Sequence, residues 1–126
     1  MSATFATIQA LLASPTVTAI VEDRIGPISG GTKWPDIIVY QVTDESYEGV
    51  SRTTDLSQAR VTIEMRARSA TQVENLAVAV KEALRNRRGI FAGKSCVFLK
   101  GVSDVGDTND DMSIFRRMSD YYVTYS

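Results

Sequence analysis

The segment of residues 60–84 changes its hydrophobic period at Ser69, and this change constrains the fold more than any other feature of the chain. Residues 60–68 alternate between apolar and polar side chains, which is the pattern of a strand with one buried face. The apolar positions are Val61, Ile63, Met65 and Ala67, and the polar ones are Arg60, Thr62, Glu64, Arg66 and Arg68. Beyond Ser69 one apolar stripe recurs at helical spacing, formed by Val73, Leu76, Ala77, Val80 and Leu84. Ser69 and Gln72 have the spacing of a capping box, so we expect a strand and then a helix that cover each other.

Length and composition favour one folded domain spanning residues 1–126. The chain is 44% hydrophobic and 23% charged, as is ordinary for a globular protein, and its net charge is -1. No apolar stretch is long enough for a membrane span, and the opening residues lack the basic start of a signal peptide, so we expect a soluble protein with no membrane partner. Its one cysteine, Cys96, fits a reducing cytoplasm and a place in the core. Histidine is absent, which removes the usual general base and metal ligand, and we expect no catalytic, metal-binding or cofactor-binding residue.

The first forty residues predict two short helices and a strand. Residues 4–13 carry Phe5, Ile8, Leu11 and Leu12 at helical spacing. Residues 15–21 follow as a second helix, with Ser14 as its cap and Val17, Ile20 and Val21 directed inward. Residues 26–35 are rich in glycine and proline and predict a loop. Residues 37–42 are nearly all apolar, which predicts a central strand covered on both faces.

The remaining chain predicts a long acidic loop and a hairpin. Residues 43–57 are polar and acidic, so we expect an irregular loop, mobile in the free protein, of the kind that is often functional. The helix after Ser69 should end in a basic stretch with Gly89 as a left-handed cap. Residues 95–102 and 113–125 predict strands joined by a polar turn. The predicted fold class is α+β, with element order α-α-β-β-α-β-β and a mostly antiparallel four-stranded sheet covered by helices on one face.

Several charged groups are candidate binding sites. The aspartates of residues 104–111 lack the spacing of a calcium loop. A basic cluster of Arg85, Arg87, Arg88, Lys94 and Lys100 would suit phosphate, although compensation of the helix dipole explains it more simply. The polar strand face of Arg60, Thr62, Glu64, Arg66 and Arg68 has no second helical layer to cover it, so it is open either to water or to a partner.

The order of these pieces resembles the tail terminator, or tail completion, proteins of long-tailed bacteriophages and gene transfer agents. Four stretches carry the resemblance. They are Ala19-Ile20-Val21-Glu22-Asp23-Arg24-Ile25-Gly26-Pro27, Trp34-Pro35-Asp36-Ile37-Ile38-Val39-Tyr40-Gln41, Ile63-Glu64-Met65-Arg66-Ala67-Arg68-Ser69, and Arg116-Arg117 leading to Asp120-Tyr121-Tyr122-Val123. The resemblance runs nearly end to end, although an aromatic residue common in relatives is absent from residues 65–67.

The resemblance implies a structural protein rather than an enzyme. Such proteins form a ring, commonly of six subunits that can be monomeric alone, on the head-proximal end of the tail tube. The ring stops tube polymerisation and joins the head completion, or connector, protein. The protein would be made in the host bacterial cytoplasm and reside in the virion, at the junction of head and tail.

The expected subunit interface joins two oppositely charged surfaces. It sets Asp44, Glu45 and Glu48 of one subunit against Glu64, Arg66 and Arg68 of the next, with an apolar edge around Tyr121 and Val123 supplying most of the affinity. Sequence-specific nucleic-acid binding is not expected. The alternative left open is an α+β module that binds RNA or another protein through Arg60, Arg66, Arg68 and the tyrosines of the last strand.

Overall fold

The computed structural model describes residues 3–27, 34–48, 55–85, 87–108 and 114–125, with the backbone alone for residues 42–48, 55–57, 94, 100–105 and 107–108. The described residues form three helices and six strands. The helices are α1 (Ala3–Leu12), α2 (Pro15–Val21) and α3 (Ala70–Leu84). The strands are β1 (Ile25–Gly26), β2 (Asp36–Glu48), β3 (Asp55–Ala67), β4 (Arg88–Phe91), β5 (Lys94–Thr108) and β6 (Phe115–Tyr125).

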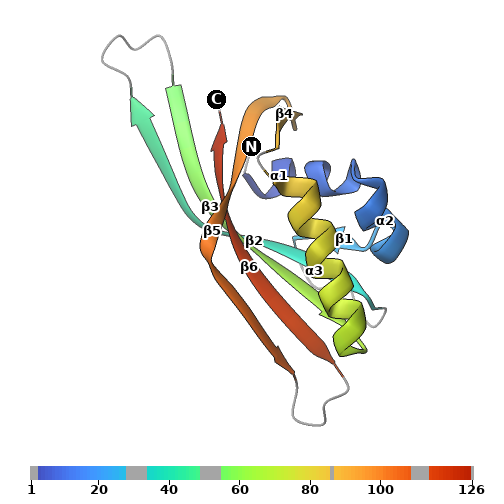
Figure 1. Ribbon diagram of the computed structural model, residues 1–126. Helices are drawn as coiled ribbons and strands as arrows, with labels where there is room; N and C mark the ends of the chain where they lie inside the picture. The colour runs from blue at the N-terminus through green and yellow to red at the C-terminus, as the bar shows by residue number, and fades with distance from the viewer. Residues whose placement is uncertain (1–2, 28–33, 49–54, 86, 109–113, 126) are drawn as a thin grey trace.

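The six strands make one sheet in the order β1-β2-β3-β6-β5-β4, with all three helices on one of its faces (Figure 1). The four long strands β2, β3, β6 and β5 pair with one another in antiparallel fashion, which confirms the predicted antiparallel core and the β5–β6 hairpin. The predicted count of four strands is wrong, because β1 adds a parallel edge strand and β4 an antiparallel one. Both are short, at two and four residues, so neither forms a run long enough to show a hydrophobic period.

The helix α3 matches its prediction closely. Ser69 is the N-cap, and its Oγ accepts the amide of Gln72 at 3.1 Å. Gln72 returns a bond through its Oε1, but to the amide of Arg68 at 3.4 Å rather than to that of the cap residue. Leu76 and Val80 lie in the same buried cluster as Ile63 and Met65 of β3, as the two hydrophobic periods predicted. The predicted left-handed cap at Gly89 is wrong, because the helix ends at Arg85 in an extended conformation and Gly89 pairs with Cys96 inside the sheet.

The buried face of helix α1 agrees in part with the prediction. Ile8 and Leu11 are buried as expected, whereas Phe5 and Leu12 are exposed. The buried face is instead formed by small residues, which let the helix approach its neighbours closely: Ala3, Thr4, Ala6, Thr7 and Ala10. The helix α2 agrees with its prediction in bounds and cap, since Ser14 Oγ accepts the amide of Val17 at 3.4 Å.

The region predicted as a long acidic loop is largely strand. Residues 43–48 pair with residues 55–60, so β2 and β3 continue as an antiparallel hairpin through a register shift near Thr43. Backbone pairing tolerates polar side chains on a two-stranded extension, which is why a reading based on hydrophobic period missed it. Residues 49–54, and with them part of the predicted loop, lie outside the described residues. The strand β2 is also not central, since only two of its residues, Ile37 and Ile38, have a β1 neighbour.

The core lies between the sheet and the helices. Its largest buried side chains include Leu11, Ile63, Leu76, Phe98 and Tyr121. Cys96 is buried as predicted. Among the described residues, no single helix has the length and hydropathy of a membrane span, and only α1 and α2 taken together pass that test, bent by 90° at their junction.

Candidate assembly surface

The face of the sheet away from the helices carries charged side chains that are paired with one another. The first group begins at Asp36, whose two oxygens accept Arg66 Nε at 2.9 Å and Nη2 at 2.5 Å. This double contact is the largest cause of the raised pKa of the Arg66 guanidinium. The guanidinium carbons of Arg66 and Arg68 lie 5.8 and 4.9 Å from the centre of the Trp34 ring, so the indole carries two cations.

The second group surrounds Glu64. Its Oε2 accepts the hydroxyl of Tyr40 at 2.9 Å, and its Oε1 accepts Arg116 Nη1 at 3.1 Å. The three residues come from β2, β3 and β6, so the carboxylate links three strands. Partial burial, followed by this hydrogen bond to Glu64, raises the pKa of Tyr40.

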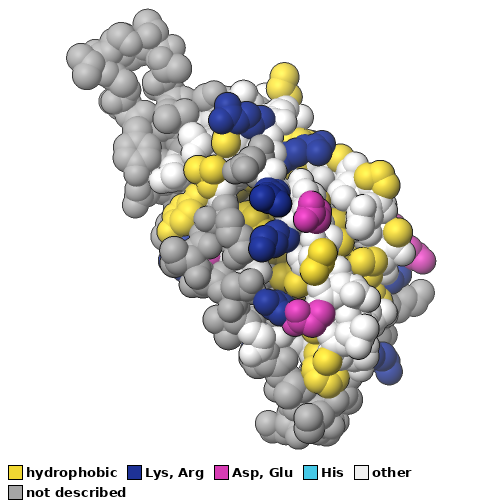
Figure 2. Space-filling view, in the orientation of Figure 1, with side chains coloured by type: hydrophobic (Ala, Val, Ile, Leu, Met, Phe, Trp, Pro, Cys, Tyr) yellow, Lys and Arg dark blue, Asp and Glu magenta, His cyan; other side chains and the backbone are white. Residues whose placement is uncertain are grey.

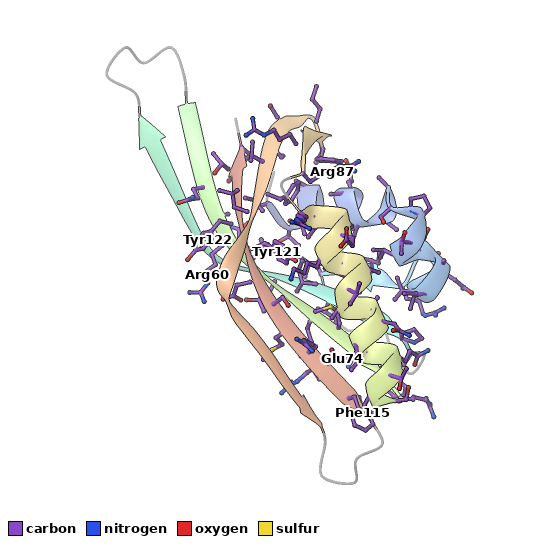
Figure 3. The ribbon with its side chains drawn as sticks, viewed as in Figure 1. Arg60, Glu74, Arg87, Phe115, Tyr121 and Tyr122 are labelled. Carbon is purple, nitrogen blue, oxygen red and sulfur yellow. The ribbon has the colours of Figure 1, made fainter. Side chains whose placement is uncertain are left out.

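The third group surrounds Asp120 on β6. Its Oδ1 accepts the hydroxyl of Thr62 at 2.9 Å, and its Oδ2 accepts both Nε, at 3.0 Å, and Nη2 of Arg60. Figure 3 shows Arg60 and Tyr122 on the side of the sheet away from the helices, with Tyr121 turned toward them. The three carboxylates of this face, Asp36, Glu64 and Asp120, are each at most 6% exposed, because the arginines and hydroxyls cover them.

This arrangement changes what the predicted interface residues are able to do. Glu64 and Arg66 are engaged inside their own chain, so they are poorly placed to exchange ion pairs with a neighbour. Arg68 is exposed and makes no ion pair with a described residue. Tyr121 and Val123 are 1% and 0% exposed on the helix-covered face of β6, which lies between β3 and β5 and is not an edge. They therefore belong to the core, and the apolar edge expected around them is absent.

The acidic residues of the predicted interface lie on the β2–β3 hairpin. Asp44, Glu45 and Glu48 are in β2, where their backbone pairs with Ala59, Gln58 and Asp55. Figure 1 shows this end of β2 and β3 reaching beyond the helices. The structure does not bring these three residues next to Arg66 within one chain, since Arg66 pairs with Asp36 at the opposite end of the same strand pair.

Two strand edges lack a neighbour among the described residues. On β2, residues 39–48 have no strand on the side away from β3. On β5, residues 99–108 have none on the side away from β6, because β4 pairs only as far as Val97. Unpaired edges of this length are sites where another strand adds to a sheet.

The sequence identified one partner in each group of paired charges and missed the other. Arg60, Glu64 and Arg66 were identified on their strand, whereas the partners Asp36, Arg116 and Asp120 were not. Alternation along residues 116–122 places Arg116 and Asp120 on one face of a strand, so a signal was present. Only the register of β3 with β6, however, shows that this face meets the charges of β3.

The described part of the chain has no group of three or more acidic or cysteine side chains suited to a metal ion. Its most organised feature is a charge-paired sheet face between two strand edges that have no neighbour among the described residues. The fold and this surface define a small α+β protein with open sheet edges.

Comparison with known proteins identifies the family. Residues 6–126 match the family described as Tail completion protein gp17, so the chain belongs to that family and is a structural protein of a phage-type virion tail. No curated protein sequence matches it. A chain in a structure described as "Virion of native gene transfer agent (GTA) particle" has the same fold, with a TM-score of 0.71 and 12% identity, over 95% of this chain and 91% of that one.

Proposed function

We propose that copies of this chain form a closed ring that caps the head-proximal end of a tail tube, stops its polymerisation and presents a joining surface to a head completion protein. The role is structural and involves no catalysis. Family membership supports the place in the tail, and the fold shared with a chain of a gene transfer agent virion agrees with it.

The observation that carries the ring is the pair of open edges on opposite sides of the sheet. Because neighbouring strands alternate in direction along β2, β3, β6 and β5, the strands β2 and β5 run in opposite directions. Rotation about an axis along the strands preserves each direction. The β5 edge of one copy would therefore meet the β2 edge of the next as an antiparallel pair, and a heterologous contact of this kind closes into a ring when the rotation divides a full turn. We propose that the ring contains six copies of the chain.

The charge-paired face would then line the channel, since the helices occupy the other face. Arg60, Arg66 and Arg116 on this face are held by carboxylates of the same chain, so these three cations are less available to bind phosphate. The same pairing weakens the alternative of an RNA-binding module, because Arg60 and Arg66 were two of the residues that it required.

Tail length tests the proposal. Tails assembled without this chain should grow beyond their normal length and fail to join heads, and adding the purified protein should restore both properties. Tails of normal length in its absence would overturn the proposal.

A further inference from the structure

Four exposed cations lie in the last turn of α3, in the connection that follows it and at the start of β4, and we define them as the basic ridge: Lys81, Arg85, Arg87 and Arg88. None makes an ion pair with a described residue. Only Arg87 has a partner of another kind, since its guanidinium carbon lies 5.7 Å from the centre of the Phe91 ring. Figure 2 shows dark blue side chains gathered along one flank of the helix, and Figure 3 places Arg87 near its end. The helix dipole is equivalent to about half a charge at this end, so it compensates at most one of the four.

The opposite charge is concentrated on the β2–β3 hairpin, in what we define as the acidic arm: residues 43–48 and 55–57. The sequence of the arm contains four acidic residues and no basic one, the acidic ones being Asp44, Glu45, Glu48 and Asp55. Ser57 is the last residue toward the tip that has a partner on β6, so beyond it the arm is two-stranded. Figure 1 shows that no helix covers it.

The register of the sheet places the arm and the ridge at the same level on opposite edges. One row of paired residues crosses five strands, from Ser46 through Ser57, Tyr125 and Cys96 to Gly89. Ser46 follows Glu45 in the arm, and Gly89 follows Arg88 in the ridge. Within one chain the strands β3, β6 and β5 separate the two surfaces.

We propose that the acidic arm of each copy lies on the basic ridge of the next copy in the ring. This inference rests on the proposed function and names the contact that supports it. When rotation about the strand direction brings the β2 edge of one copy to the β5 edge of another, the row that ends at Ser46 in one meets the row that ends at Gly89 in the other. Of the two cations expected to receive the arm on the outer sheet face, Arg66 already has a carboxylate partner and Arg68 lies over the Trp34 ring, whereas the ridge has no carboxylate partner among the described residues. A chain with 14 basic and 15 acidic residues thus carries two complementary patches at little net charge.

Reciprocal charge reversal tests the contact in tail assembly. The ridge variant carries Arg85→Glu, Arg87→Glu and Arg88→Glu, and the arm variant carries Asp44→Lys, Glu45→Lys and Glu48→Lys. Each alone sets like charges together at every contact, so we expect each to need more than about tenfold higher concentration than the unmodified protein to restore normal tail length. Mixed in equal amounts they should regain activity, because the acidic arm of one meets the basic ridge of the other and the reverse contact is also complementary.

Two matched controls separate charge from general damage. Glu22→Lys with Asp23→Lys reverses exposed acidic residues away from the arm and should leave activity unchanged. Replacing the three ridge arginines by lysine keeps the charge and should retain most of the activity. Circular dichroism of each variant checks folding.

A cross-link gives an independent measurement if a charge variant fails to fold. In a Cys96→Ala background, Glu45→Cys protein and Arg88→Cys protein, whose substituted positions lie in the same row of the sheet register, are mixed and oxidised. Covalent dimers should form in this mixture, whereas Glu22→Cys with Arg88→Cys should give none. A disulfide requires Cα atoms closer than about 7 Å, so a dimer reports direct contact.

These experiments distinguish a failure of the arm–ridge contact from a failure of the proposed function. Full activity of either reversed variant alone, failure of the mixture to recover, or absence of the Glu45→Cys and Arg88→Cys dimer would overturn the arm–ridge contact while leaving the ring in place. If the unmodified protein does not limit tail length, the proposed function fails and the inference fails with it.

Discussion

Asp36 and Arg66 face each other across β2 and β3 and are joined by two hydrogen bonds, of 2.9 and 2.5 Å, on the side of the sheet that has no helices. The side chain of Asp36 is 8% exposed and that of Arg66 is 17% exposed. A carboxylate this well covered depends on its partner, because water reaches it poorly. The outer face therefore contributes to the stability of the single chain, besides any part it plays in assembly.

Removal of Asp36 should destabilise the protein far more than removal of an exposed carboxylate that also pairs with arginine. Asp36→Ala leaves Arg66 partly buried without its main partner, and we expect a loss of about 3 kcal/mol, at the lower end for a broken buried pair. The matched control is Glu74→Ala. Glu74 pairs with Arg117, but 58% of its side chain is exposed, so its loss should cost below about 1 kcal/mol. Urea unfolding of both variants measures the difference, and equal midpoints would contradict it.

The same pair shows why charge reversal at Arg66 is a poor test of assembly. Arg66→Glu would place a second carboxylate against Asp36, so the variant should unfold more readily before any association is measured. The basic ridge is a better target, since its side chains are exposed and have no ionic partner among the described residues.

The hydrophobic period alone was enough to predict the strands and helices that have one apolar and one polar face. The strand of Ile63 and the helix of Leu76 were identified with their inward residues, because each has one apolar face and a clear boundary at Ser69. The strands β1 and β4 are too short for the side-chain patterns that such reasoning needs, and the arm is mostly polar in sequence. Pairing of those segments is set by backbone hydrogen bonds, which the side-chain pattern does not encode.

For a related reason, the sequence predicted one partner of each charge pair on the candidate surface but not the other. The charges of β3 are visible in one stretch of sequence, but their partners Asp36 and Asp120 are 30 and 60 residues away from Arg66 and Arg60. Phe5 was placed inward because it is large and apolar, whereas the close approach of α1 favours the alanines on its other side. Register and packing distance, which are tertiary properties, decided both outcomes.

The packing of α3 on the sheet predicts a contrast between two residues of that helix. Leu76 is 0% exposed and Val78 is 60% exposed. Leu76→Ala should lower the free energy of unfolding by about 2–5 kcal/mol, through lost contacts and an unfilled cavity. Val78→Ala should change it by less than about 0.5 kcal/mol. Urea denaturation would contradict this account if the two variants unfolded at the same concentration.

The buried thiol of Cys96 predicts a loss of stability at alkaline pH. Burial raises the pKa of Cys96 above its ordinary 9.0, although a backbone hydrogen bond at Phe91 opposes the shift. The folded chain therefore keeps this proton at a pH where the unfolded chain releases it. The resulting stabilisation is complete below pH 9 and declines by about 1.4 kcal/mol per pH unit above it, until the folded pKa is reached.

A comparison with Cys96→Ala isolates this effect from the titration of tyrosines and lysines. The difference in free energy of unfolding between the two proteins should be constant from pH 7 to 8.5 and should shrink above pH 9. Parallel pH profiles throughout would show that the thiol titrates alike in the folded and unfolded chains.

The most direct test of the ring is an electron cryomicroscopy structure of the head-proximal end of the tail. The account predicts one closed ring of this chain at that end, with β2 of each copy beside β5 of the next, the helices facing outward and the acidic arm on the neighbouring basic ridge. Copies of the chain repeated along the tube, or a terminal ring whose subunits meet through their helices with both strand edges unpaired, would contradict it.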